Sequence, residues 1–315
     1  MPTFRRRDLL PTVLEPLLND PSATEVIVAS DGGQDGSVEL LRRLAETSPT
    51  LIVLDLPHGG REAARRAGIE AAVGDVVLLM DDDVRADPGL VSGHARAHAD
   101  GLADVISGYM PVALPAPRRP GIAPTLLYAA EYEQHCASVE AEQTTSLFRL
   151  WGGNVSLPRD LALEVTEGPD FPASFGEDTH MGLRCHRSGA SGRFLRSLSA
   201  QHLHSRTLAQ FVKDSFEQGA GKYWLHHLHP DLLGSLDLSH FTASLPATLR
   251  RMIDRHEEAT KRMASAVVHL GGAARIYAAE TAGVKLLRKV ALQEGVMQAK
   301  SLAEGGSKED EDRVP

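Results

Sequence analysis

The chain has 315 residues, enough for one large α/β domain with an extension or for two small domains. Its net charge of -9 argues against a general nucleic-acid binder, which needs a basic surface. The only two cysteines, Cys136 and Cys185, make neither a disulfide scaffold nor a zinc-binding spacing, so we expect a reducing compartment. We find no stretch as long as a membrane span and no secretory signal, and we expect a cytoplasmic protein or one peripheral to the membrane.

Strand and helix patterns alternate along the first eighty or so residues of the sequence. Short apolar runs predict strands, and one-sided apolar stripes predict helices between them. Short connections between such elements are typical of a parallel sheet built from right-handed crossovers. The predicted strands are 25–29, 51–54 and 76–80, and the predicted helices are 8–18, 38–45 and 61–72. The fold class is therefore predicted to be α/β.

Three carboxylates, Asp81, Asp82 and Asp83, directly follow the predicted strand 76–80, which is apolar enough to be buried on both faces. Open α/β sheets bind ligands outside the carboxyl ends of their strands. Neighbouring carboxylates repel one another unless a cation compensates them, and hard divalent ions take such oxygen ligands. Removing Asp83 is accordingly expected to stabilise the metal-free protein slightly. Acidic strand ends are also ordinary turn and helix-cap sequences, so the triplet alone does not decide between these interpretations.

The remainder of the chain is less regular. A strand is predicted at 104–110, a turn entering a strand at 151–157, and helices at 125–139, 179–187 and 208–216. Near the C-terminus, apolar residues repeat at helical spacing, which indicates packing on the main domain or, in a homodimer, on a second copy. These residues are Met263, Val267, Leu270, Ala274 and Tyr277.

Three regions are predicted along the chain. Residues 1–225 form the main domain and residues 226–304 form a C-terminal helical extension. Residues 305–315 are charged and poor in apolar residues, so we expect a disordered tail there.

Six short motifs occur in a fixed order: Pro2-Thr3-Phe4, Ser30-Asp31-Gly32, Gly60 to Gly68, Asp81-Asp82-Asp83, Gly152-Gly153-Asn154 and Glu177-Asp178. In this order they resemble the family 2 glycosyltransferases of the GT-A fold, over roughly residues 2–225. The resemblance implies a Rossmann-like, mostly parallel sheet flanked by helices. It also implies inverting transfer of a sugar from a nucleotide-diphosphate donor, UDP or GDP, to an acceptor hydroxyl. Because residues 218–224 lack the Gln-x-x-Arg-Trp sequence of processive polymerases, we expect non-processive transfer.

The resemblance further assigns the residues that would bind the donor and its divalent metal, Mg²⁺ or Mn²⁺. The implied donor-binding residues are Pro2, Asp31, Arg65, Asp81 and Asp82. The implied metal ligands are Asp83, Asp81, His202 and His204. We expect one of the two histidines to bind the metal and the other to be structural.

Several of these assignments have a plainer alternative. Asp31 also suits a turn in a glycine-rich loop. Arg65 is followed by Arg66, and the sequence does not decide which of the two points inward.

On the acceptor side, the resemblance makes Asp178 the general base that takes the proton of the attacking hydroxyl. Glu177, Gly152, Gly153 and Asn154 would line the acceptor. Without the resemblance, Glu177 and Asp178 are ordinary acids in the first turn of a helix, favoured by its dipole.

Two other functions are compatible with parts of the pattern. A nucleotidyltransferase also uses an α/β sheet and a metal, but it needs a basic residue in an early phosphate loop, and residues 30–37 contain no Lys or Arg. A non-catalytic sugar-binding protein on the same fold is the other alternative. The combination of Asp81, Asp83 and Asp178 disfavours it.

The resemblance also predicts a gap in the sheet. In this family a buried strand precedes the Pro-Thr turn, which here begins at residue 2. Without that strand, the strands at 26–29 and 76–80 would leave backbone N–H and C=O groups unpaired, at about 1–3 kcal/mol each. We expect the native reading frame to start about five to ten residues upstream, or else the flanking strands to close up or another segment to fill the gap.

Overall fold

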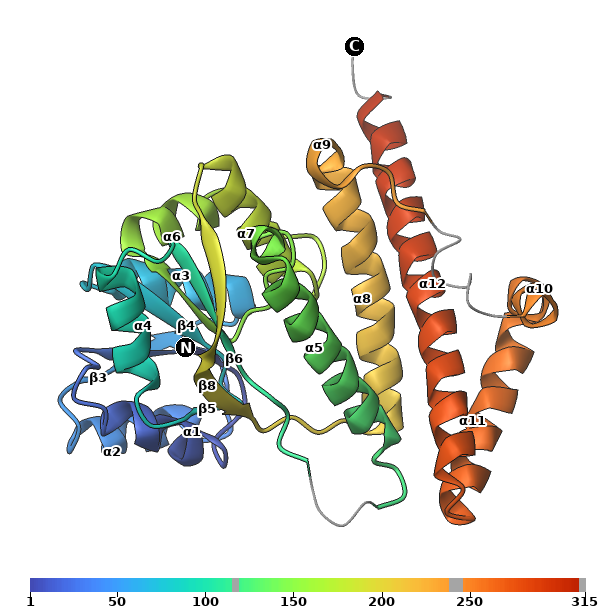
Figure 1. The fold of residues 1–315 in the computed structure, drawn as a ribbon, viewed down its shortest axis with the longest axis horizontal. Helices are drawn as coiled ribbons and strands as arrows, with labels where there is room; N and C mark the ends of the chain where they lie inside the picture. The colour runs from blue at the N-terminus through green and yellow to red at the C-terminus, as the bar shows by residue number, and fades with distance from the viewer. Residues whose placement is uncertain (115–118, 238–245, 312–315) are drawn as a thin grey trace. The chain divides into compact units, whose positions relative to one another are not determined.

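The computed structural model describes residues 1–114, 119–237 and 246–311, and the chain divides into two compact units (Figure 1). The first, the α/β unit, comprises residues 1–113, 132–170 and 181–204. The second, the helical unit, comprises residues 114–131, 171–180 and 205–315. The sequence predicted a boundary between two continuous regions at residue 225. The helical unit instead includes residues 205–225 and two earlier segments, 114–131 and 171–180.

The α/β unit contains eight strands in the part of the chain that the structure describes. They are β1 (Pro2–Thr3), β2 (Val26–Asp31), β3 (Leu51–Leu56), β4 (Val76–Met80), β5 (Val84–Ala86), β6 (Val105–Tyr109), β7 (Asn154–Pro158) and β8 (Gly192–His202). Its complete helices are α1 (Leu10–Leu18), α2 (Ser37–Ala45), α3 (Arg61–Ala71), α4 (Leu90–Ala99) and α6 (Arg159–Thr166), with a short 3-10 helix at Gln143–Thr145. Helices α5 (Ala123–Ala141) and α7 (Glu177–Arg187) begin in segments of the helical unit and end in the α/β unit.

The strands form two sheets. One has the order β1-β2-β3 and is entirely parallel. The other has the order β4-β7-β6-β8-β5, with β6 and β8 parallel and the other neighbours antiparallel. The predicted α/β class is confirmed, and the second sheet is mixed because β5 and β7 run opposite to β4, β6 and β8.

Two apolar clusters hold these sheets and their helices together. In the first, the predicted stripe of α1 is fully buried at Leu10, Val13 and Leu14, with β2 and β6 among its partners. In the second, Ile69 of α3 and Ala162 of α6 pack with β4 and β7. Helix α1 begins two residues later than predicted, and Leu9 occupies its N-cap position without a side-chain hydrogen bond.

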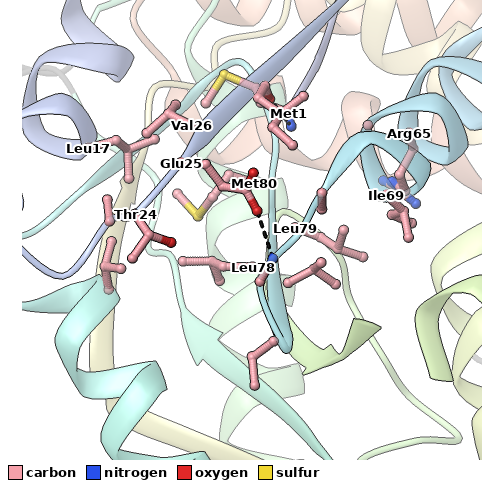
Figure 2. Close-up of a pocket in the computed structure, with 18 of the residues that line it drawn as sticks. Met1, Leu17, Thr24, Glu25, Val26, Arg65, Ile69, Leu78, Leu79 and Met80 are labelled. Carbon is pink, nitrogen blue, oxygen red and sulfur yellow. Dashed lines mark hydrogen bonds between the residues drawn. The ribbon is translucent and has the colours of Figure 1, made fainter. Parts of the chain in front are cut away.

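A cavity of about 170 Å³ separates the two sheets where the sequence predicts a gap (Figure 2). Val26 and Ile27 of β2 line it on one side, and residues 76–80 of β4 line it on the other. At one end the short β1 pairs with β2, and the Met1 amino group donates a hydrogen bond to the Ile27 carbonyl at 2.9 Å. Among the described residues the flanking strands do not pair with each other, and no strand fills the space between them.

The helical unit is built from α8 (Leu208–Leu228), α9 (Pro230–Leu233), α10 (Ala247–Arg255), α11 (Glu257–Ala273) and α12 (Tyr277–Glu311), together with the first parts of α5 and α7. Glycines allow its long helices to pack closely: a Cβ on Gly219 would clash with the Leu292 backbone, and one on Gly295 with the Phe216 backbone. Among the described residues, no helix combines the length and the apolar composition that a membrane span requires.

The segment 305–315, for which disorder is predicted, overlaps the end of α12. Helix α12 continues to Glu311, so residues 305–311 of this segment are helical in the structure. Residues 312–315 of the predicted tail lie outside the described residues.

Candidate functional site

The acidic triplet lies where β4 ends, as the sequence predicted. The Asp81 backbone N–H donates a long hydrogen bond, 3.4 Å, to the Gly153 carbonyl. Gly153 has a φ of +93°, and a Cβ there would lie 2.8 Å from an Asp81 carboxylate oxygen. Only glycine fits both requirements, so Gly153, with Gly152 before it, forms backbone that packs directly on Asp81.

The next two carboxylates have different surroundings. Asp82 accepts a hydrogen bond from the Thr3 hydroxyl at 2.8 Å, yet burial raises its pKa to about 6. Burial also opposes ionisation of Asp83, but the hydrogen bond from His202 and the nearby charges of His202, Arg6 and His204 together outweigh burial and lower the pKa of Asp83 to about 2. The position next to β4 therefore contains one strongly ionised carboxylate, Asp83, beside a carboxylate that resists ionisation.

His202 and His204 reach Asp83 through strand pairing. In the antiparallel β5–β8 ladder, Val84 lies opposite His202. This pairing brings the His202 ring beside Asp83, the residue that precedes Val84. His202 Nε2 lies 3.3 Å from Asp83 Oδ1, and the two imidazole rings are 4.7 Å apart. All three side chains are buried. We refer to Asp83, His202 and His204 as the Asp-His-His cluster.

The Asp-His-His cluster fits a divalent metal ion. One potential ligand atom from each residue lies within 4.8 Å of the others. Two ligands on opposite sides of an ion, each at about 2.1 Å, are about 4.2 Å apart, so small adjustments suffice. One carboxylate oxygen and two imidazole nitrogens suit a transition metal such as Mn²⁺ better than Mg²⁺, which prefers oxygen ligands and retains its waters.

Two arginines border the acidic triplet. Arg65 is buried, with Nη2 3.7 Å from Asp81 Oδ1, whereas Arg66 forms a 2.7 Å ion pair with Asp170. Arg65 is therefore the arginine that faces the triplet, which the sequence left open. Arg6 was not among the predicted site residues; its guanidinium lies 3.5 Å from Asp82 and 3.6 Å from Asp83. The residues around Arg6 in the sequence do not indicate this role, because its partners Asp82 and Asp83 lie more than seventy residues away.

The Asp31 carboxylate holds two loops together. It is buried and accepts hydrogen bonds from the Gly59 N–H at 2.6 Å and the Gly60 N–H at 3.1 Å, and His58 Nδ1 lies 2.9 Å from it. These contacts give Asp31 the loop-forming role of the plainer alternative, and its contact with a donor base stays a prediction. The exposed face beside it belongs to His58, which stacks on Phe4 with ring centroids 4.9 Å apart.

Asn154 has a structural role in place of the expected contact with an acceptor. Its side chain is fully buried; its amide donates to the Leu198 carbonyl at 3.0 Å, and its Oδ1 lies 2.9 Å from His94 Nε2. Burial lowers the pKa of His94 to about 4, so the ring stays neutral and donates this hydrogen bond. These bonds leave Asn154 no polar atom for an outside ligand. The sequence could not show this, because His94 lies sixty residues away.

Other expected site residues are placed as follows. Pro2 is buried in β1, pairs with Ala29 and lines the cavity between the sheets. Glu177 and Asp178 open α7, two residues earlier than predicted, in the segment that belongs to the helical unit. Glu177 is buried and Asp178 is half-buried. Gly176 precedes them with a φ of +102°, which lets the loop turn sharply into the helix.

Comparisons with protein families cover most of the chain. A model described as "Glycosyl transferase family 2" matches residues 1–129, and one described as "Glycosyl transferase family group 2" matches residues 76–225. The second match ends at the residue where the sequence resemblance was expected to end.

Two curated relatives match shorter segments. The uncharacterized glycosyltransferase YibD of Escherichia coli K12 is 34% identical over 89 residues, which cover 28% of this chain and 26% of that protein. An undecaprenyl-phosphate 4-deoxy-4-formamido-L-arabinose transferase of Aeromonas hydrophila is 44% identical over 66 residues, 20% of each chain. The matches thus span about a quarter or less of these relatives.

Two solved structures share the fold over nearly the whole chain. The mannosyltransferase PcManGT from Pyrobaculum calidifontis, in complex with GDP-Man and Mn²⁺, has a TM-score of 0.57 at 16% identity, covering 93% of this chain and 85% of that one. Residues 1–349 of Staphylococcus aureus TarS give a TM-score of 0.50 at 14% identity, covering 96% and 90%. At these identities the similarity concerns the fold alone.

Proposed function

The chain belongs to the family 2 glycosyltransferases, and on that premise we propose that it transfers a sugar from a nucleotide-diphosphate donor to an acceptor hydroxyl with inversion. The observation that carries this proposal is the Asp-His-His cluster at the carboxyl end of β4, with Asp81 and Arg65 beside it. A cation site next to a buried arginine suits a diphosphate, which brings two or more negative charges that must be compensated.

We propose that Asp83, His202 and His204 hold the divalent metal, with Mn²⁺ preferred. When bound there, the metal neutralises the diphosphate and stabilises the charge that develops on it as the sugar leaves. Asp83 is suited to this role because it stays ionised, and the neutral form of each imidazole offers one nitrogen lone pair.

Arg6 and Arg65 complete the charge balance of the donor site. In the structure they compensate the triplet, Arg65 at Asp81 and Arg6 at Asp82 and Asp83. Arg65 is buried and fixed, whereas the Arg6 side chain is 40% exposed. We propose that Arg6 turns from the carboxylates to the donor phosphates when the metal takes over at Asp83.

We propose that Asp178 is the general base, since inversion requires a group that removes the proton from the attacking hydroxyl. Its place at the half-exposed start of α7 is compatible with access to solvent-borne acceptors. Asp178→Asn is expected to lower turnover by about two to four orders of magnitude while donor affinity stays within about threefold. A parallel fall in donor affinity would place Asp178 in the donor pocket instead, and unchanged turnover would remove it from the mechanism.

The donor class is testable without knowing the acceptor. UDP and GDP, each with and without Mn²⁺, are compared for their effect on thermal unfolding and then by calorimetry. The proposal predicts a Mn²⁺-dependent rise in Tm with one of the two, and a tenfold preference for one base corresponds to about 1.4 kcal/mol. The absence of any Mn²⁺-dependent nucleotide binding would contradict the proposed donor site.

A further inference from the structure

The hairpin of α11 and α12 exposes an apolar stripe at its tip. The α11 residues that pack inward are Thr260, Ala264, Val268, Gly271 and Gly272. Beside them run three apolar side chains at helical spacing, Met263, Val267 and Leu270, which are 44%, 37% and 70% exposed. Ile276, in the turn to α12, is 56% exposed. The sequence predicted that this stripe packs, but within the helical unit it faces outward.

The charges around this tip are opposite in sign to those of the whole protein. Residues 259–279 contain no Asp or Glu, whereas the chain as a whole carries a net charge of -9. The segment carries four basic side chains, Lys261, Arg262, His269 and Arg275. Lys261 pairs with acids of α11 and α12, but Arg262 and Arg275 are exposed beside the apolar stripe.

A second segment adds to the same tip. The buried carboxylate of Glu280, the first acid after the turn, accepts a hydrogen bond from the Gly121 N–H at 2.8 Å. Pro120 lies next to Gly272, where an added Cβ would be 3.8 Å from it. The neighbouring Arg119 is exposed, so a third arginine belongs to this region. The turn between α11 and α12 lies at the lower end of the hairpin in Figure 1.

The tip is also firmly built. A Cβ on Gly271 would lie 2.7 Å from the Glu280 backbone nitrogen, so the two helices approach closely there. Arg275 has a φ of +57° and donates its backbone N–H to the Gly272 carbonyl at 3.0 Å, which closes the turn. Leu270 and Ile276 are thus presented on a fixed turn rather than on a loose loop.

We propose that this tip, residues 262–276 with Arg119, docks onto the surface of an anionic lipid membrane. Protruding apolar side chains with arginines at their edge are the combination that interfacial helices use: the apolar groups enter the headgroup boundary and the arginines contact the lipid phosphates. The absence of acids from the tip removes the repulsion that the remaining acidic surface would impose. A second copy is the less suitable occupant, because docking two tips would bring their arginines together.

The test is flotation of the full chain with lipid vesicles. Wild type is expected to bind phosphatidylglycerol–phosphatidylethanolamine vesicles, and to bind phosphatidylcholine vesicles at least about fivefold more weakly. Raising the salt to about 0.5 M should weaken the first interaction. Leu270→Asp with Ile276→Asp should lower binding at least about tenfold. Leu302→Asp is the matched control, since Leu302 is an apolar α12 residue that is 64% exposed outside the tip, and it should bind as wild type does.

Both substituted positions of the tip are exposed, so unchanged helix content and Tm are expected and are measured first. Failure of wild type to bind anionic vesicles would overturn the proposal, as would equal binding by the doubly substituted variant. A dimer in solution that the double substitution dissociates, with no vesicle binding, would assign the tip to a second copy and also overturn it. None of these outcomes depends on the sugar-transfer activity.

Discussion

Among the described residues, two groups of side chains have the spacing of a metal site. They differ in the positive charge that already balances their carboxylates. The Asp-His-His cluster is buried, and it combines one ionised carboxylate with two imidazoles. The other group, Glu257, Glu258 and Glu294, lies on α11 and α12 and is largely exposed. The difference shows that acidic residues in proximity do not by themselves make a metal site.

The glutamate group already contains a cation. Lys261 Nζ lies 3.0 Å from Glu257 and 3.3 Å from Glu258, and it also contacts Glu294. Burial and the hydrogen bond that protonated Glu294 donates to Glu257 raise the pKa of Glu294 to about 7, although Lys261 opposes this. The Lys261 ammonium and the proton on Glu294 thus already balance the carboxylates that a metal ion would bind. In the Asp-His-His cluster, by contrast, Asp83 forms an ion pair with the partly exposed Arg6.

The largest effect is expected for Asp83→Ala. It removes the ionised ligand of the Asp-His-His cluster, so Mn²⁺-dependent nucleotide affinity should fall at least about 100-fold by calorimetry. Glu294→Ala is the control and should leave this affinity unchanged. Undiminished Mn²⁺-dependent affinity in Asp83→Ala, or a comparable loss in Glu294→Ala, would break the distinction between the two groups.

The same substitution tests an expectation from the sequence. Repulsion within the triplet predicted that losing Asp83 would stabilise the metal-free protein. In the structure Asp83 is held by His202 and Arg6, at 3.3 and 3.6 Å, so its removal should cost about 1 kcal/mol of stability. Chemical unfolding without metal measures this, and a higher stability than wild type would restore the repulsion argument.

A smaller effect is expected for Lys261→Met, which removes the ammonium from the glutamate group. Three carboxylates then share one region without a cation, and stability at neutral pH should fall by about 1–2 kcal/mol. Ca²⁺ or Mn²⁺ at millimolar concentration should recover part of this loss, because the freed carboxylates can then bind an ion weakly. Wild type should show no such recovery. A variant as stable as wild type would mean that Lys261 does not compensate the group.

The smallest effect concerns the pH dependence of the glutamate group. A carboxyl whose pKa is raised in the folded state contributes stability below its unfolded pKa and loses that contribution as the pH rises through its folded pKa. Glu294 should therefore lower the Tm between about pH 5 and pH 8. Glu294→Gln cannot ionise, so its Tm should fall less over the same interval. Parallel Tm curves for the two proteins would show that Glu294 does not titrate there.

Much of the fold could be predicted because it depends on local pattern. The strands at β2, β3 and β4 and the helices between them follow from apolar runs and stripes a few residues long. Arg65 and the acidic triplet were found for the same reason. The structure then decided in favour of Arg65 over Arg66, since Arg66 has its own partner in Asp170.

The parts that escaped prediction depend on contacts between distant residues. The short β5 and the polar β8 have weak strand patterns, and only their pairing brings His202 to Asp83. The partners of Arg6 and of Asn154 are likewise far away in the chain. For Asn154, sequence position suggested a ligand contact, whereas His94 and the Leu198 carbonyl take its polar atoms within the core.

The central claim is that the metal binds at the Asp-His-His cluster, and pulsed electron spin resonance of bound Mn²⁺ tests it directly. With Mn²⁺ and the preferred nucleoside diphosphate, the electron spin echo of the wild-type complex should show coupling to imidazole nitrogen, as a histidine-ligated ion requires. The coupling should be lost in His202→Asn with His204→Asn, and it should persist in Glu294→Gln. A wild-type Mn²⁺ complex without nitrogen coupling, or coupling that survives removal of both histidines, would contradict the account.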